Sequence, residues 1–219
     1  NSIRNEIKKI IVGQDEMVKL IITALLADGH VLIEGVPGVA KTLTAKLVAK
    51  SVNVGFSRIQ FTPDLMPSDV LGTPVFNPKE ASFEFKKGPV FSNIVLVDEI
   101  NRAPAKTQSA LLEIMEERQA TVDGKTFPMA SPFMVLATQN PVEQEGTYRL
   151  PEAQLDRFLF KILVPYPNET EELAILSQFH NMGNTTAMDM IQPALQGEQV
   201  VALRKQIKMQ IIEEKLLQF

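Results

Sequence analysis

The sequence has 219 residues, of which 45% are hydrophobic and 22% are charged, with a formal net charge of −4 and no cysteine. This length supports one sizeable core with a small appendage, and the lack of cysteine excludes disulfides, thiol catalysis and cysteine metal sites. The mildly acidic balance gives no long-range attraction to nucleic acid or anionic membranes.

No uninterrupted apolar run approaches the roughly 20 residues that a membrane-spanning helix requires. The first residues also lack the apolar region of a signal peptide. Together with the absence of cysteine, these features favour a cytoplasmic protein. The sequence does not begin with Met, so we expect a trimmed or partial form of something longer.

The hydrophobic pattern predicts an α/β fold, with strands alternating with helices over residues 1–167. Residues 2–27 come first, as a helix that breaks at Val12 and Gly13 and then resumes. Strands follow over residues 31–33, 55–61, 91–98, 133–138 and 158–164, and helices over residues 41–51 and 104–119. Such alternation indicates a parallel sheet covered by helices on both faces.

Two segments interrupt the alternation. Residues 75–85 carry three phenylalanines around a polar turn, and residues 121–129 contain Asp123 followed by Gly124, a strong two-residue hairpin turn. Both segments are predicted to be hairpins inserted into the α/β core. Ordinary surface loops remain the alternative.

The pattern changes after Pro165, which predicts a division into a core over residues 1–167 and a second segment over residues 168–219. Residues 169–180 have a helical pattern, and residues 181–197 form a polar connector with Met, Pro and Gly. A second helical pattern covers residues 199–219.

Residues 35–42, GVPGVAKT, follow a predicted strand and open a predicted helix, which is the context of a phosphate-binding loop. Backbone N–H groups and the helix N-terminus favour bound phosphate. Lys41 is expected to reach the β- and γ-phosphates, and Thr42 to offer its hydroxyl to Mg²⁺. Ala40 replaces the usual Gly, so we expect right-handed helical geometry there. The alternative is a glycine-rich turn that binds nothing.

Residues 94–99 form an apolar strand that ends in Asp98 and Glu99. Burial explains the apolar residues but not two acids at the carboxyl end of a strand, where open α/β sheets bind ligands. Asp98 is predicted to hold Mg²⁺, directly or through water, and Glu99 to polarise the attacking water as general base. The alternative is a strand that ends in a solvated acidic turn.

Two further polar residues flank the later strands. Asn140 follows the fourth strand and is a candidate to position water or contact the γ-phosphate, but taken without the other motifs a turn asparagine before proline is the favoured interpretation. Arg157 precedes the fifth strand, and the residues alone favour a local salt bridge to Asp156 or Glu152 at least as much as a catalytic role. Neither histidine has metal-ligand spacing.

Five segments together resemble the MoxR family of AAA+ ATPases, in its order and at workable spacing: IVGQ, GVPGVAKT, VLVDEINRAP, ATQNP and LPEAQLDRF. The resemblance covers residues 11–167 and implies a five-stranded parallel sheet with AAA+ strand order. In this family Ala before the phosphate-loop lysine is common. The nucleotide is then expected to contact Val12, Gly13, Gly35, Val36, Pro37, Gly38, Val39, Ala40, Lys41, Thr42 and Leu43.

The resemblance also implies that Asn140 is the sensor-1 residue and that Arg157 is an arginine finger acting on a neighbouring subunit, with Arg102 at the same interface. The two hairpins resemble the helix-2 and pre-sensor insertions of this clade. Residues 168–219 would be the start of a helical lid, and no residue here can be assigned as its second sensor arginine.

These features predict an ATP hydrolase that uses ATP and Mg²⁺ to remodel or activate partner protein complexes. Family resemblance implies a homo-oligomer, a hexamer by AAA+ analogy, and client proteins that include von Willebrand A-domain proteins. The alternatives are a magnesium-chelatase-type ATPase subunit, a scaffold that binds ATP without turnover, and a nucleic-acid motor. The motor would need basic hairpin tips. The hairpins carry too few lysines to favour nucleic acid as a partner, namely Lys79, Lys86, Lys87 and Lys125.

Overall fold

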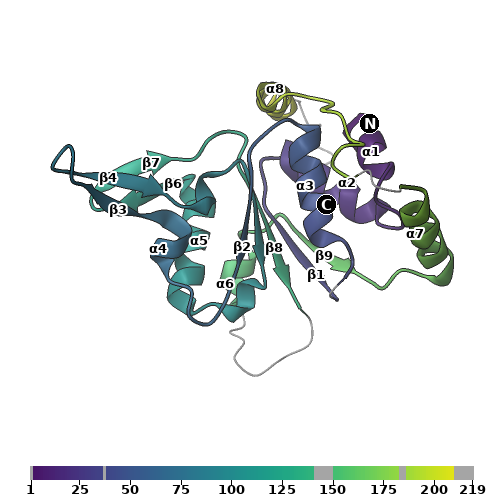
Figure 1. The fold of residues 1–219 in the computed structure, drawn as a ribbon, viewed down its shortest axis with the longest axis horizontal. Helices are drawn as coiled ribbons and strands as arrows, with labels where there is room; N and C mark the ends of the chain where they lie inside the picture. Colours follow the sequence, from purple (N-terminus) through teal and green to yellow (C-terminus); the bar gives the residue numbers. More distant parts are fainter. Residues whose placement is uncertain (1, 37, 141–149, 183–185, 210–219) are drawn as a thin grey trace, which may run out of the picture.

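The computed structural model describes residues 2–36, 38–140, 150–182 and 186–209. Its centre is a five-stranded parallel sheet in the order β2-β5-β8-β1-β9 (Figure 1). The strands are β1 (Val31–Gly35), β2 (Phe56–Gln60), β5 (Ile94–Asp98), β8 (Met134–Gln139) and β9 (Phe160–Val164). The prediction of a five-stranded parallel sheet with AAA+ strand order is therefore confirmed.

The register of this sheet brings the carboxyl ends of its strands to one edge. Gln60 of β2 lies opposite Asp98 of β5, and Val97 lies opposite Ala137 of β8. Ile33 of β1 lies opposite Thr138. The loops that follow these strands therefore start side by side, which is where ligands of open α/β sheets bind.

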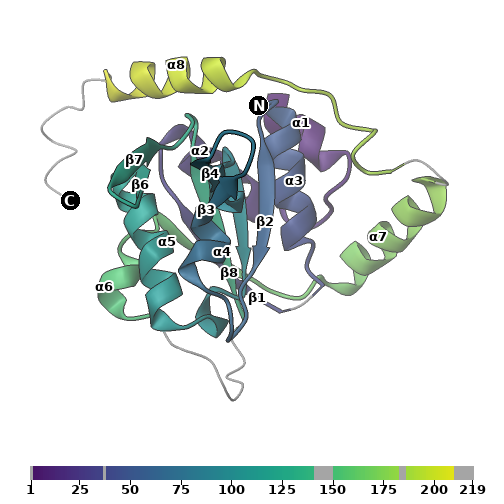
Figure 2. The ribbon, with the colours of Figure 1, turned by 60° about the vertical axis from the view of Figure 1, so that its left-hand side comes forward.

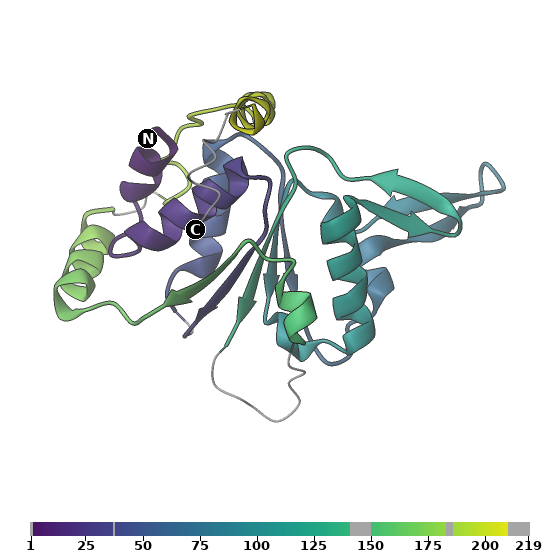
Figure 3. The same ribbon diagram turned by 180° about the vertical axis from the view of Figure 1, so that it is seen from behind.

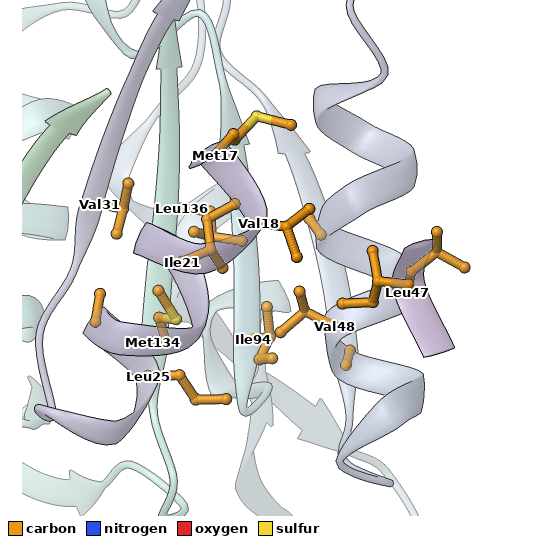
Figure 4. Packing of buried hydrophobic residues seen from close by; sticks show 14 of the residues in the cluster. Met17, Val18, Ile21, Leu25, Val31, Leu47, Val48, Ile94, Met134 and Leu136 are labelled. Carbon is orange, nitrogen blue, oxygen red and sulfur yellow. The ribbon is translucent and has the colours of Figure 1, made fainter. Parts of the chain in front are cut away.

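Helices cover both faces of the sheet, as predicted (Figures 1 and 3). One face packs against α1 (Ser2–Lys8), α2 (Asp15–Leu26) and α3 (Lys41–Ser51), and the other against α4 (Pro67–Leu71) and α5 (Ala105–Glu117), with the short α6 (Glu152–Leu155) nearby. Side chains of β5 alternate between these layers, because Ile94 and Leu96 belong to the first cluster and Val95 and Val97 to the second. Figure 4 shows the first cluster, where α2 and α3 meet the sheet.

The two predicted hairpins are present, so the surface-loop alternative is wrong. β3 (Gly72–Asn77) pairs with β4 (Ser82–Lys87), and β6 (Gln119–Val122) pairs with β7 (Lys125–Pro128), both antiparallel. Asp123 and Gly124 have φ of 49° and 73°, as a two-residue hairpin turn requires. The hairpins contact each other through Phe85 and Phe127, whose stacked rings lie 4.4 Å apart. They extend away from the central sheet beyond α4 and α5 (Figure 1), on the side that Figure 2 turns toward the reader.

Some element boundaries differ from the prediction. The strand expected over residues 91–98 begins at Ile94, because Pro89–Phe91 form the 3₁₀ helix η1, with proline at its favourable first position. A second 3₁₀ helix, η2 (Ile100–Arg102), and helix α4 were not predicted. They are short, and short elements carry little periodic signal.

The C-terminal part contains α7 (Glu169–Met182) and α8 (Gly197–Lys208). Val200 of α8 is buried in the same cluster as α2 and α3, and buried Arg204 donates from Nε to the carbonyl oxygen of Leu25 at 2.8 Å. The end of the helix predicted over residues 199–219 lies partly outside the described residues. The domain division near residue 167 stays a prediction.

Buried His30 has a structural role. Its Nδ1 accepts a hydrogen bond from the Val135 N–H at 2.9 Å, so Nε2 carries the proton and donates to the Met115 carbonyl at 3.0 Å. Burial lowers the pKa of His30 to about 3 and keeps the ring neutral. Within the described part of the chain, no helix is both long and apolar enough to cross a membrane.

Candidate functional site

A small polar cavity of about 180 Å³ lies at the carboxyl ends of β1, β5 and β8. We call it the polar cavity, and it is lined by Gly35, Gly38, Lys41, Thr42, Arg58, Gln60, Asp98, Glu99, Thr138 and Asn140. It therefore joins the phosphate loop, the acidic pair and Asn140 in one place. Pro37 lies outside the described residues.

Two glycines of the phosphate loop occupy positions that are unfavourable for a larger residue. Gly38 has φ of +90°, in the region that favours glycine. A side chain at Gly35 would place its Cβ 2.8 Å from the carbonyl oxygen of Val164, so the contact between β1 and β9 excludes one. Val36 packs against the core, not in the polar cavity.

Ala40 overturns one expectation. It has φ of 55° and ψ of 20°, which is left-handed, and it precedes the first residue of α3. Right-handed geometry was expected because only left-handed geometry favours glycine. The chain instead holds an alanine in the left-handed region, at a cost of roughly 1–2 kcal/mol. Such strain persists when the surrounding structure fixes the backbone, and it is frequent at functional sites.

Lys41 begins α3 and points back across the loop. Its Nζ donates to the carbonyl oxygen of Gly35 at 2.5 Å. Desolvation lowers the pKa of Lys41, and the nearby charges of Asp98 and Glu99 act in the opposite direction. A half-buried ammonium at a helix N-terminus is a favourable place for an anion, since the cation and the helix dipole have the same sign there.

Asp98 is 7% exposed and is held on both carboxylate oxygens. The Thr138 hydroxyl donates to Oδ1 at 3.1 Å, and Arg58 donates from Nε to Oδ2 at 2.6 Å. Thr138 in turn accepts the backbone N–H of Glu99 at 3.0 Å. This one hydroxyl therefore fixes the carboxylate of the first acid and the backbone of the second.

Glu99 occupies a strained position where β5 ends, with φ of 56° and ψ of 51°. Its Oε2 accepts hydrogen bonds from Gln60 Nε2 at 3.0 Å and from Arg102 Nη1 at 2.9 Å. The carboxylate is therefore aimed into the polar cavity by a neighbouring strand and by η2. Arg102, expected at a subunit interface, forms an ion pair with Glu99 in this structure.

The donors of the polar cavity fit Mg²⁺. Thr42 and Asp98 supply hard oxygen ligands in one small cavity, and Mg²⁺ in nucleotide sites takes only one or two protein ligands, with phosphate oxygens and water completing the octahedron. Among the described residues, no group of three or more His, Cys, Asp or Glu side chains forms an all-protein metal site.

A larger cavity of about 520 Å³ shares Gly38 of the phosphate loop with the polar cavity and has mostly apolar walls. We call it the apolar cavity, and it is lined by Ile10, Ile11, Val12, Gln14, Gly38, Val39, Ala40, Leu43, Pro167, Ile175, Gln178, Thr186 and Ala187. Val12, expected to contact the nucleotide, lines this cavity, whereas neighbouring Gly13 does not. Its volume lies in the range of about 300–1,000 Å³ typical of small-molecule sites.

Arg157 lies away from both cavities. Its Nη2 pairs with Glu116 Oε2 of α5 at 2.7 Å, and its Nη1 donates to the carbonyl oxygen of Ala153 at 2.9 Å. The local partners expected from the sequence, Asp156 and Glu152, are therefore replaced by a residue about 40 positions earlier. About one third of the Arg157 side chain is exposed.

Four residues of these networks were not predicted from the sequence: Arg58, Gln60, Glu116 and Thr138. Arg58 and Gln60 are two positions apart in a strand, so they share a face, and this spacing was a usable signal. Their position beside the acidic pair depends on the pairing of β2 with β5, which the sequence alone does not give.

Comparisons with known proteins show which proteins the chain is similar to. Residues 30–160 match the family model described as "ATPase family associated with various cellular activities (AAA)". The chain is 58% identical over 180 residues to Chaperone MoxR1 of Mycobacterium tuberculosis, covering 82% of this chain and 47% of that protein. It is 32% identical over 189 residues to Protein MoxR of Methylorubrum extorquens, covering 83% and 54%.

A solved structure is also similar. The crystal structure of a presumed ATPase from Cytophaga hutchinsonii matches with a TM-score of 0.88 and 48% identity, covering 98% of this chain and 64% of that one. The chain thus spans less than two thirds of the length of each of these three relatives.

Proposed function

Because the chain belongs to the MoxR family of AAA+ ATPases, we propose that it binds and hydrolyses ATP with Mg²⁺ to remodel or activate partner protein complexes. The observation that carries this proposal is the polar cavity, where Lys41, Thr42, Asp98 and Glu99 line one small volume. Binding of a triphosphate needs the first two residues, and hydrolysis needs the acids.

Each residue has a chemical task in this proposal. Lys41 and the N–H groups at the start of α3 bind the β- and γ-phosphates. Thr42 and Asp98 hold Mg²⁺, which neutralises charge that develops on the phosphate oxygens. Glu99 orients and deprotonates the attacking water, and Asn140 holds that water or the γ-phosphate. Both contacts of Glu99 converge on Oε2, so we assign water activation to Oε1.

Lys41→Ala tests the proposal directly. Nucleotide binding should fall by at least about tenfold, because a charge-assisted contact to phosphate contributes roughly 1.5–3 kcal/mol. The measurement is titration of a fluorescent ATP analogue with Mg²⁺. Lys46→Ala is the matched control, since Lys46 is an exposed lysine of the same helix. Equal affinity of Lys41→Ala and the control would contradict the phosphate-loop assignment.

Arg157 is proposed to act on the ATP of a neighbouring subunit in a ring, and by AAA+ analogy we propose that this ring is a hexamer. Arg157 lines neither the polar nor the apolar cavity of its own chain. A fixed arginine stabilises charge on the transferring phosphoryl group and is worth roughly 10³- to 10⁵-fold in rate when it acts as a finger. Arg157→Ala should therefore bind ATP almost normally and lose hydrolysis.

Mixing tests the action between subunits. Lys41→Ala loses its own site but still offers Arg157, so mixing it with Arg157→Ala in the full-length protein should restore part of the ATPase activity. Co-assembly of the two variants is checked first. No recovery at any ratio, or full activity of a dilute monomer, would leave Arg157 as the ion-pair partner of Glu116.

Protein clients, rather than nucleic acid, are favoured as partners. The hairpins offer few lysines, and Lys87 Nζ lies 5.2 Å from the centre of the Phe91 ring of its own chain. We propose that the clients are von Willebrand A-domain proteins and that the protein acts in the cytoplasm. Co-precipitation of such a domain with full-length protein, with and without ATP, tests the client assignment.

A further inference from the structure

Strand β2 reaches into the polar cavity with two side chains that the proposed chemistry does not use. Arg58 donates from Nε to Asp98 Oδ2 at 2.6 Å, and Gln60 donates to Glu99. Arg58 Nη2 also donates to Gln60 Oε1 at 3.4 Å. One face of an unassigned strand therefore contacts both acids on which metal binding and water activation depend.

The two partners of the Arg58–Asp98 ion pair differ in solvent exposure. The side chain of Asp98 is 10% exposed and that of Arg58 is 51% exposed. A half-exposed guanidinium regains hydration when it moves away, so little free energy is lost. Asp98 cannot move as freely, because Thr138 holds its other oxygen. In any exchange of partners at Oδ2, Arg58 is therefore the group that leaves.

We propose that Arg58 is a positioning residue for Asp98, which it holds when no metal is bound and for which it competes with Mg²⁺. The inference rests on the proposed function, since it assumes that Mg²⁺ arrives with nucleotide at Asp98. A guanidinium and Mg²⁺ are both cations and need the same carboxylate, so they oppose each other there. Arg58 thus lowers the gain in nucleotide affinity that Mg²⁺ provides.

A direct contact of Arg58 with bound phosphate is the competing explanation, because Arg58 lines the same cavity. The two explanations predict opposite results. A phosphate contact helps nucleotide binding whether or not Mg²⁺ is present, so its loss weakens binding in both conditions. Competition at Asp98 matters only when Mg²⁺ is present, so its loss strengthens binding in that condition alone.

The experiment measures the affinity for a fluorescent ATP analogue in Mg²⁺ and in EDTA, and takes the ratio of the two. Arg58→Gln should raise this ratio by about three- to tenfold, the range for loss of a hydrogen bond to a charged group that is partly exposed. Arg58→Lys keeps the charge and should stay closer to the wild-type ratio. The ratio needs no turnover, so it is independent of hydrolysis.

Lys161→Gln is the matched control. Lys161 is also a cation on an outer strand of the sheet, its side chain is 48% exposed, and it pairs with Glu34 at 2.9 Å. The variant has the same change in net charge but lies outside the polar cavity, so its ratio should equal that of the wild type. A ratio that rises in both variants would overturn the proposal, because it would report net charge.

The remaining outcomes distinguish failure of this inference about Arg58 from failure of the proposed function. An unchanged or lowered ratio in Arg58→Gln overturns the role of Arg58, and weaker binding in EDTA assigns Arg58 to phosphate. Thermal unfolding of each variant is compared with wild type, and Arg58→Lys provides the measurement if Arg58→Gln fails to fold. Failure of the wild-type protein to bind the analogue in either condition overturns the proposed function, and this inference with it.

Discussion

The polar and apolar cavities share the phosphate loop but are built in different ways. The polar cavity, about 180 Å³, has walls of charged and amide side chains tied to each other by hydrogen bonds. The apolar cavity, about 520 Å³, is lined mainly by aliphatic side chains from the α1–α2 connection, α3 and the C-terminal segment. Gly38 lines both.

This difference separates two kinds of recognition. In the polar cavity a displaced atom leaves a charge without its partner, so small changes have large effects on chemistry. In the apolar cavity the contribution scales with the area that a ligand buries, roughly 25 cal/mol per Å². Substitutions in the first should therefore change rates by orders of magnitude, and substitutions in the second should change affinity by much less.

Glu99→Gln should have the largest effect of these substitutions, and it should change the rate of hydrolysis at the polar cavity without changing binding. The amide keeps the shape of the carboxylate but cannot accept a proton, so hydrolysis should slow by roughly 10²- to 10⁴-fold while ATP binding stays close to normal. Phosphate release and binding of a fluorescent ATP analogue are measured on the same sample of full-length protein. Retained turnover would place the general base elsewhere.

Leu43→Ala tests whether the apolar cavity binds the base of the nucleotide. Leu43 lines that cavity and not the polar one, and removal of its branched end should weaken binding of ATP about three- to tenfold, or roughly 1 kcal/mol. Binding of inorganic tripolyphosphate, which has no base, should not change. Competition of each ligand against the fluorescent analogue provides both values.

A matched control separates the cavity from the core behind it. Leu43 and Leu195 are both partly buried against the same hydrophobic cluster, and Leu195 lies outside the apolar cavity. Leu195→Ala should therefore lose stability without losing ATP affinity. Equal losses of ATP and tripolyphosphate affinity in Leu43→Ala would break the distinction between the two cavities.

Ala40, which lines the apolar cavity and not the polar one, should give the smallest effect. Its φ of 55° is strained for any residue with a Cβ, so Ala40→Gly should raise the free energy of unfolding by up to about 1 kcal/mol, partly offset by the freer unfolded chain. Ala40→Val should lower it, because a β-branched side chain fits this region worse. Urea denaturation without nucleotide measures both, and a less stable Ala40→Gly would show that the Cβ contributes packing that outweighs the strain.

Much of the fold was predictable, because its signals are local. The strand at β5 is apolar at every position before Asp98, and the turn at Asp123 and Gly124 is sufficient to predict a hairpin. The prediction of a phosphate loop rests on local signals too, because Lys41 and Thr42 follow two glycines between a predicted strand and a predicted helix. Strand order came from the family resemblance, because residues within one strand do not specify which strand lies beside it.

The partners of the acids were less predictable. Asp98 bonds to Arg58 at a separation of 40 positions, and Arg157 pairs with Glu116 rather than with the acids next to it in the chain. Such contacts depend on sheet register and on the packing of α5. The left-handed backbone of Ala40 was also not predicted, because the backbone dihedrals of a single loop residue are set by the structure around it.

The central position of β5 has a consequence for how the protein opens. Every residue of β5 is buried, and the strand is flanked by β2 and β8, so amide hydrogen exchange there should require nearly global unfolding. The β3–β4 hairpin instead carries exposed Phe76 and Phe83, and its amides should exchange through local fraying. The hairpin can therefore open and close locally many times while β5, with Asp98, stays paired in the sheet.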